Sequence, residues 1–134
     1  MKHIKRIAAI AIIAVMVMGL AACGSKRSNK ITITNDTSWD MYYVYIAPHE
    51  DTSWGDDLLG RNTLAVGDSA EFTLPSANNN MYDICLIDED GDGWIWGNVE
   101  IKGTERGSIQ AGPYLTLSDG SSILGNIEYG YGNS

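Results

Sequence analysis

A hydrophobic period of two is the feature that most constrains how this 134-residue chain can fold. Ile31 and Ile33 alternate with threonines, and Val99 and Ile101 alternate with polar residues. Such alternation is typical of strands that turn one face to a core and the other to solvent. After residue 22, no window has the i, i+3, i+4, i+7 spacing that an amphipathic helix requires. We therefore expect an all-β protein.

The segments between turn signals define the expected strands. Residues 41–47 and 81–88 are apolar on both faces and should lie centrally in a sheet. Residues 64–74 predict a hairpin around Gly67-Asp68, and residues 113–118 and 123–129 predict further strands, whereas the polar residues 103–112 predict a connection. Short strands separated by turns predict a single small antiparallel β-sandwich of about seven strands.

The N-terminus has the pattern of an export signal. Lys2, Lys5 and Arg6 precede an apolar run that ends at Ala22 and is shorter than the roughly 20 residues of a membrane-spanning helix, which is the alternative interpretation. Leu20-Ala21-Ala22-Cys23 resembles the lipobox of bacterial lipoproteins. The resemblance implies that Cys23 becomes the first mature residue and carries the lipid, palmitate included, which anchors the protein to the membrane.

This interpretation divides the chain into three parts. Residues 1–22 are the predicted signal peptide, residues 23–30 the lipidated cysteine with a flexible linker, and residues 31–134 the β-sandwich domain. Gly24 after the cysteine resembles the signal for delivery to an outer membrane, where the cell has one. We expect a membrane-anchored lipoprotein of the bacterial cell envelope, in the outer membrane or at the cell surface.

The charge of the expected domain is strongly one-sided. All 17 acidic residues follow Ile31, together with only three of the nine basic residues, Arg61, Lys102 and Arg106. A surface of this sign repels nucleic acid and anionic lipid. We expect no nucleic-acid partner, and cations or a basic protein remain as candidate ligands.

The acidic segment 88–92 is the most distinctive candidate site. Asp88, Asp90, Asp92 and Gly93 match the first half of the calcium loop D-x-[DN]-x-[DN]-G, in which alternate residues direct oxygens to the ion. The second half departs from the pattern, since position twelve is Val99 in place of glutamate. The half-motif resembles calcium loops of other extracellular folds, whose remaining ligands come from a neighbouring loop.

The candidates for those remaining ligands lie in the loop after residue 48 and are Asp51, Asp56 and Asp57. Calcium is accordingly the one cofactor we expect. The alternative is a well-solvated acidic turn that binds no metal, with the repulsion between its carboxylates screened by solvent.

Several motifs of the domain also resemble known β-sandwiches. Asn35-Asp36-Thr37, the run YYVYIAP, the run WGDDLLG and the run YDICLIDEDGD are similar in order and spacing to a group of small secreted bacterial β-sandwich domains with no assigned activity. The acidic loop after an apolar strand is also loosely similar to C2 domains. These resemblances imply the fold and leave the function open.

Tryptophans suggest a second candidate site. Trp94 and Trp96 alternate with Ile95, and placing Ile95 in the core predicts that both indoles face outward as a platform for sugar rings, with Trp54 as a further member. The alternative is that they are buried and structural. Cys85, in an apolar run, is expected to be buried and inert.

Catalysis has little support in the sequence. His49 is the only histidine after residue 22 and has no nucleophile motif beside it, so we expect no enzyme. The leading hypothesis is a lipid-anchored binding module stabilised by calcium, with carbohydrate or a basic protein as its partner. The alternatives are a structural or envelope-interaction lipoprotein without a ligand, and a carboxylate-based hydrolase.

Overall fold

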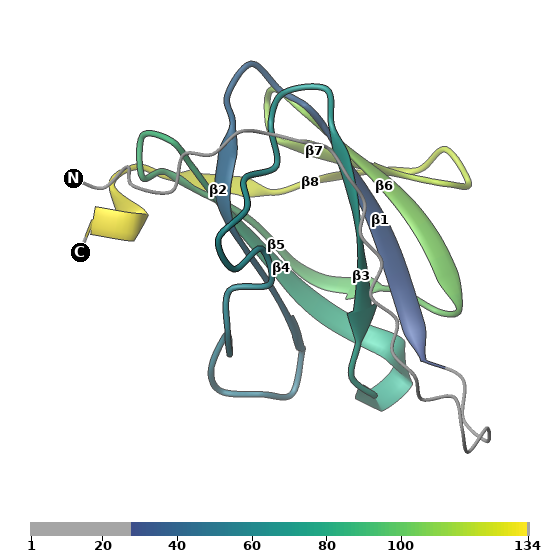
Figure 1. Ribbon diagram of the computed structural model, residues 1–134. Helices are drawn as coiled ribbons and strands as arrows, with labels where there is room; N and C mark the ends of the chain where they lie inside the picture. The colour runs from purple at the N-terminus through teal and green to yellow at the C-terminus, as the bar shows by residue number, and fades with distance from the viewer. Residues whose placement is uncertain (1–27, 134) are drawn as a thin grey trace.

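Two β-sheets packed face to face form the domain in the computed structural model, which describes residues 28–133 (Figure 1). The five-stranded sheet has the order β3-β1-β6-β7-β8, and the four-stranded sheet has the order β2-β4-β5-β9. The expected β-sandwich is therefore confirmed. The predicted signal peptide and Cys23 lie outside the described residues.

The strands are β1 (Asn29–Asp36), β2 (Met41–Pro48), β3 (Ser69–Leu74), β4 (Met81–Asp88), β5 (Gly93–Glu100), β6 (Thr104–Gln110), β7 (Tyr114–Leu117), β8 (Ser122–Leu124) and β9 (Asn126–Glu128). Two short 3-10 turns, η2 (Asn78–Asn80) and η3 (Tyr131–Asn133), complete the described chain. Asn29 and Lys30 thus belong to β1, two residues before the expected start of the domain. Within residues 28–133, no helix has the length and apolarity needed to cross a membrane.

The core lies between the sheets and is built from the alternating residues. Ile31 and Ile33 of β1 face Val44 and Ile46 of β2 and the inner residues of β4 across it, and all are buried. Burial of these aliphatic and aromatic side chains is the main stabilising term for a domain of this size.

One strand forms where a connection was predicted. β6 occupies residues expected to be a loop, and it pairs in parallel with β1 while all other strand pairs are antiparallel. Only Gly107 and Ile109 of β6 are buried. A Cβ on Gly107 would lie 2.9 Å from a methyl group of Leu115, so the core has no room for a larger residue there. The strand therefore carries too little apolar content to be recognised in the sequence.

The hairpin expected around Gly67-Asp68 is wrong. β3 pairs with β1, and Leu64 makes only an isolated bridge with Met41. The backbone N–H of Asn35 donates to the backbone carbonyl of Asp68 at 2.9 Å, and the N–H of Gly67 donates to the backbone carbonyl of Asn35 at 2.7 Å. The turn is thus held by the end of β1.

Residues 123–129, expected as one strand, divide between the two sheets. β8 joins the five-stranded sheet and β9 joins the four-stranded sheet. The chain changes sheets at Gly125, where a Cβ would lie 2.7 Å from the Trp96 indole and would also overlap the Ile95 carbonyl oxygen. Only glycine fits at this crossing.

A β-bulge in β5 reverses which residues face the core. Tyr82 pairs with Val99 and Ile84 pairs with Trp96, so β5 has one residue more than β4 between these pairs. Asn98 in the bulge has φ 58°, a left-handed conformation that asparagine tolerates better than most residues.

Trp94 and Trp96 therefore lie in the core before the bulge, and Val99 and Ile101 lie in it afterwards. The inward position of Val99 and Ile101 is confirmed. The outward assignment of the two tryptophans, and the inward assignment of Ile95, are wrong because an unbroken alternation was assumed across the bulge.

Candidate functional site

Three carboxylates meet at the turn between β4 and β5. One oxygen from each of Asp88, Asp90 and Asp92 lies within 4.8 Å of the others. Asp88 is only 3 % exposed, Asp92 is half-buried and Asp90 is exposed. The structure thus brings together the three aspartates of the predicted calcium half-motif.

Asp88 organises the turn through all of its polar atoms. Its Oδ1 accepts hydrogen bonds from the backbone amides of Asp90 at 2.9 Å and Asp92 at 3.0 Å, and its Oδ2 accepts one from the Trp94 indole at 2.9 Å. The backbone groups of Asp88 bond to Gly91 and Asp92 across the same turn. Because the buried indole needs a partner, Asp88 links the shape of the loop to the packing of the core.

The C-terminal turn closes one side of this loop. Asp92 Oδ1 accepts the Gly130 amide at 2.9 Å, and the Gly91 carbonyl accepts the Gly132 amide at 2.7 Å. The ring of Tyr131 packs on Gly93, where a Cβ would be 2.8 Å from it. Figure 1 shows η3 beside the β4–β5 turn, although about forty residues separate them in the sequence.

Oxygen donors of this kind suit a hard divalent cation. Calcium takes six to eight oxygen ligands and tolerates irregular geometry, with water completing the set, whereas magnesium requires a near-ideal octahedron. The half-exposed cluster leaves the outer side of the loop to solvent. Such a cluster can provide some of the ligands of a weak calcium site.

The predicted second group of ligands does not join the cluster. Asp57 Oδ1 instead accepts the amides of Val44 and Leu59, both at 3.0 Å, and the Leu58 amide donates to the Val44 carbonyl at 2.7 Å. Asp57 therefore covers the open edge of β2, which would otherwise present free backbone groups. Asp51 and Asp56, both exposed, are also outside the cluster. Their assignment as ligands of the Asp88 loop is wrong.

The predicted tryptophan platform is also wrong, because Trp94 and Trp96 are only 2 % and 1 % exposed. Trp96 donates its indole N–H to the Ile123 carbonyl at 3.2 Å. Trp54 alone of the three reaches the surface, where its ring centroid lies 6.5 Å from that of Tyr45. Its indole donates to the Tyr131 hydroxyl at 3.1 Å.

Tyr43 and Tyr45, on the outer face of β2, were not predicted as site residues. The rings of Tyr43 and Tyr45 are parallel to within 3°, with centroids 6.5 Å apart. Their spacing of two residues in the run 41–47 was the available signal, since alternate residues share a face.

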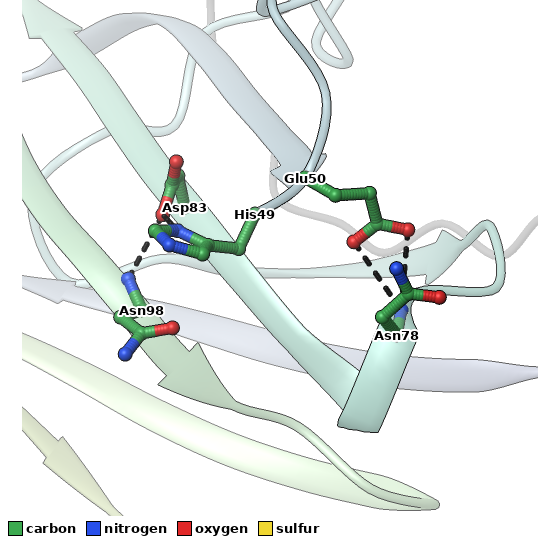
Figure 2. Close-up of polar contacts among 5 residues, drawn as sticks. All are labelled: His49, Glu50, Asn78, Asp83 and Asn98. Carbon is green, nitrogen blue, oxygen red and sulfur yellow. Dashed lines mark hydrogen bonds and ion pairs between the residues drawn. The ribbon is translucent and has the colours of Figure 1, made fainter.

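His49 contacts Asp83 away from the acidic loop. Its Nδ1 lies 2.8 Å from Asp83 Oδ1, which also accepts the backbone amide of Asn98 at 2.8 Å (Figure 2). The neighbouring Glu50 carboxylate accepts the Asn78 amide at 3.2 Å. Asp83 thus ties the end of β2 to the bulge of β5, a positioning role in the fold.

Cys85 is buried on β4, as expected. Burial, with a smaller contribution from the charge of Glu128, raises the pKa of its thiol to about 12. A thiol with this pKa holds its proton at neutral pH and is a poor nucleophile.

Comparison with known proteins assigns no activity. No family model matches the chain, and no curated protein matches it. The chain is similar to a solved structure described as "NMR structure of the protein from Eubacterium rectale", with 14 % sequence identity and a TM-score of 0.48. The match covers 78 % of this chain and 89 % of that one.

Proposed function

We propose that this protein is a lipid-anchored lipoprotein of the cell envelope whose β-sandwich is a binding module stabilised by calcium. The observation that carries the calcium site is the convergence of Asp88, Asp90 and Asp92 within 4.8 Å in a loop that Asp88 already holds in shape. Calcium would reduce the repulsion among these carboxylates and add cross-links within the loop.

The arrangement of the domain supports this role. The chain enters β1 beside Gly103, whose carbonyl accepts the Lys30 amide at 2.8 Å, and Asn29 bonds to Asn80 at the start of β4. The acidic loop follows the other end of β4, roughly 23 Å away at about 3.3 Å per residue. Figure 1 shows the start of β1 at the lower right and η3, beside the acidic loop, at the left.

With Cys23 lipidated, the end of the domain nearest the membrane would carry Lys30 and Lys102. The acidic loop would then point away from the membrane, where it could meet calcium and other envelope components. This orientation suits a binding module held close to a membrane by a short tether.

Thermal unfolding in calcium, magnesium and sodium chloride tests the calcium site. Binding to the folded state stabilises it by RT ln(1 + [L]/Kd), so with Kd on the order of 10⁻⁴ to 10⁻³ M, millimolar calcium should raise Tm by a few degrees. Magnesium should raise Tm less. Asp90→Asn should reduce the calcium effect, whereas Glu100→Gln, which removes one exposed charge from β5, should leave it unchanged.

If sodium chloride at matched ionic strength raised Tm as much as calcium does, the calcium effect would be simple screening of charge. The loop would then be a structural acidic turn, and a lipoprotein without a metal would be the better description. The observation that favours this second candidate is that Asp88 already holds the loop in shape through its own hydrogen bonds.

A further inference from the structure

The outer face of the four-stranded sheet carries a second layer of apolar side chains. Cys85 and Ile87 point away from the core between the sheets and are nevertheless buried. Tyr45 pairs in register with Cys85, and Tyr43 pairs with Ile87. The four partly exposed aromatic residues of this layer, here called the outer aromatic face, are Tyr43, Tyr45, Trp54 and Tyr131.

Contacts among these rings fix their positions. Tyr43 and Tyr45 stand parallel with centroids 6.5 Å apart, and the Trp54 ring is tilted by 48° against Tyr45 at the same distance. The Trp54 indole is bonded to the Tyr131 hydroxyl, and the C-terminal turn is bonded to the acidic loop. The rings are therefore preorganised, which lowers the entropic cost of binding a ligand.

The charge around the outer aromatic face is acidic. No lysine or arginine stands on β2, β4, β5 or β9, all of which lie within the described residues. Two carboxylates lie beside the face. Asp57 Oδ1 accepts the backbone amide of Val44, the residue between Tyr43 and Tyr45, at 3.0 Å, and after burial its charge contributes to the raised pKa of Tyr45. Glu128 pairs in register with Gly93, on which the Tyr131 ring packs.

The basic side chains of the described chain are elsewhere. Lys30 and Arg106 lie on strands of the other sheet, Lys102 follows β5, and Arg61 lies in the loop between β2 and β3. The outer aromatic face thus combines aromatic rings with negative charge, and none of the four strands of its sheet carries a lysine or arginine. A cation near an aromatic face is attracted by the ring quadrupole, and guanidinium groups also stack on such rings.

We propose that the outer aromatic face binds a basic peptide segment of a partner protein, with an arginine side chain on the rings of Tyr43 and Tyr45 and the carboxylates of Asp57 and Glu128 as its counter-charges. The proposal rests on the role as a binding module and names the class of its partner. A neutral sugar would use the same rings but would gain nothing from the two carboxylates.

A short peptide with two arginines, compared with the same peptide carrying neutral citrulline, tests this proposal. Isothermal titration calorimetry at physiological salt should show the arginine peptide binding at least five-fold more tightly. Amide shifts in a ¹H–¹⁵N NMR titration should concentrate on β2 and the C-terminal turn. Equal binding of both peptides, tighter binding of a neutral oligosaccharide, or shifts scattered over all acidic turns would overturn the proposal.

Matched variants separate the rings from the general negative charge. Tyr43→Leu keeps an apolar residue but removes the π-system, and it should raise Kd of the arginine peptide about two-fold to 30-fold, the range of cation–π energies. Tyr43→Phe should bind like the parent. Tyr114→Leu, on β7 of the other sheet and 42 % exposed, should have no effect. Equal weakening by Tyr43→Leu and Tyr114→Leu would also overturn the proposal.

The calcium experiment distinguishes this proposal from the proposed function. If calcium raises Tm and the arginine peptide does not bind, only the identity of the partner is wrong. If the arginine peptide binds and calcium has no specific effect, the peptide site stands and the calcium site is lost.

Discussion

Asp88 has two roles that conflict in any simple mutational test. It is one of three carboxylates in the candidate calcium site, and it also accepts three hydrogen bonds that hold the loop and the Trp94 indole. Its replacement damages the fold whether or not calcium binds. Asp90, which is exposed, is the position that reports on the ion alone.

We expect Asp88→Ala to lower the free energy of unfolding by roughly 3 kcal/mol, because it leaves the buried Trp94 N–H and two loop amides without their acceptor. In chelator, Asp90→Ala should change it by less than about 0.5 kcal/mol and in the stabilising direction, since one repelling charge is removed. Urea unfolding followed by tryptophan fluorescence measures both. Similar losses from the two variants would contradict the anchoring role of Asp88.

Cys85 should make stability fall at alkaline pH. Its thiol has a pKa of about 12 in the fold against an ordinary value of 9.0, so the unfolded chain releases the proton first. The contribution of the protonated thiol to the free energy of unfolding is complete below pH 9 and is lost as pH rises toward 12. Urea midpoints measured between pH 8 and 11 should decline.

Cys85→Ala is the control for that decline. The slope should become shallower in this variant, and a remainder above pH 10 is expected because burial also raises the pKa of Tyr45. An identical slope in parent and variant would contradict the assignment to the thiol.

The bulge in β5 decides which side chains belong to the core. It allows Trp94 and Trp96 to share the core with Val99 and Ile101, although two residues, an even number, lie between Trp96 and Val99 and would place the two pairs on opposite faces of a regular strand. The Asp83 carboxylate stabilises it by accepting the Asn98 amide.

We expect Asn98→Val to destabilise the domain by about 1–2 kcal/mol, because a β-branched residue is strained at φ 58°. Asn98→Gly should be close to neutral, since glycine adopts this conformation freely. Chemical unfolding measures the difference. If Asn98→Val were as stable as the parent, the left-handed conformation at this position would be wrong.

The sequence predicted those elements whose alternation is local and unbroken. The β1 isoleucines follow from the period of two, and β2 and β4 follow from short apolar runs that end at turn residues. The bulge at Asn98 and the crossing at Gly125 depend on contacts with distant residues, Asp83 and Trp96, which no local pattern records. Polar β6 was missed because its partner, β1, supplies most of the apolar side chains of the pair.

The residues of the candidate site also differ in whether a local sequence pattern could predict them. Asp88, Asp90 and Asp92 lie in one short loop, so their convergence could be predicted from the motif. The role of Asp57 could not, because it depends on covering the edge of β2. The outer aromatic face joins residues from β2, a loop and the C-terminus, and only the fold brings them together.

Two lysines and the acidic loop lie at opposite ends of the domain. Lys30 and Lys102 lie near the start of β1, and the acidic loop lies about one strand length away. In the proposed anchored protein, this arrangement would place the two lysines toward an anionic membrane surface and keep the acidic loop away from it.

Anchoring predicts that Cys23→Ser abolishes lipidation, because the thiol is the group that is acylated and a serine hydroxyl does not replace it. The variant should lose incorporation of labelled fatty acid and accumulate as an unprocessed precursor in cell fractionation. Label on the Cys23→Ser protein equal to that on the parent would contradict the assignment.

A calcium titration followed by ¹H–¹⁵N NMR tests the central claim most directly, because it locates the ion as well as detecting it. We expect saturating shifts for the amides of Asp90, Asp92 and Trp94, with Gly130 responding because its amide is bonded to Asp92. Asp90→Asn should weaken the saturation, and magnesium should shift the same amides less. Small, non-saturating shifts spread over all acidic turns would contradict a calcium site in this loop.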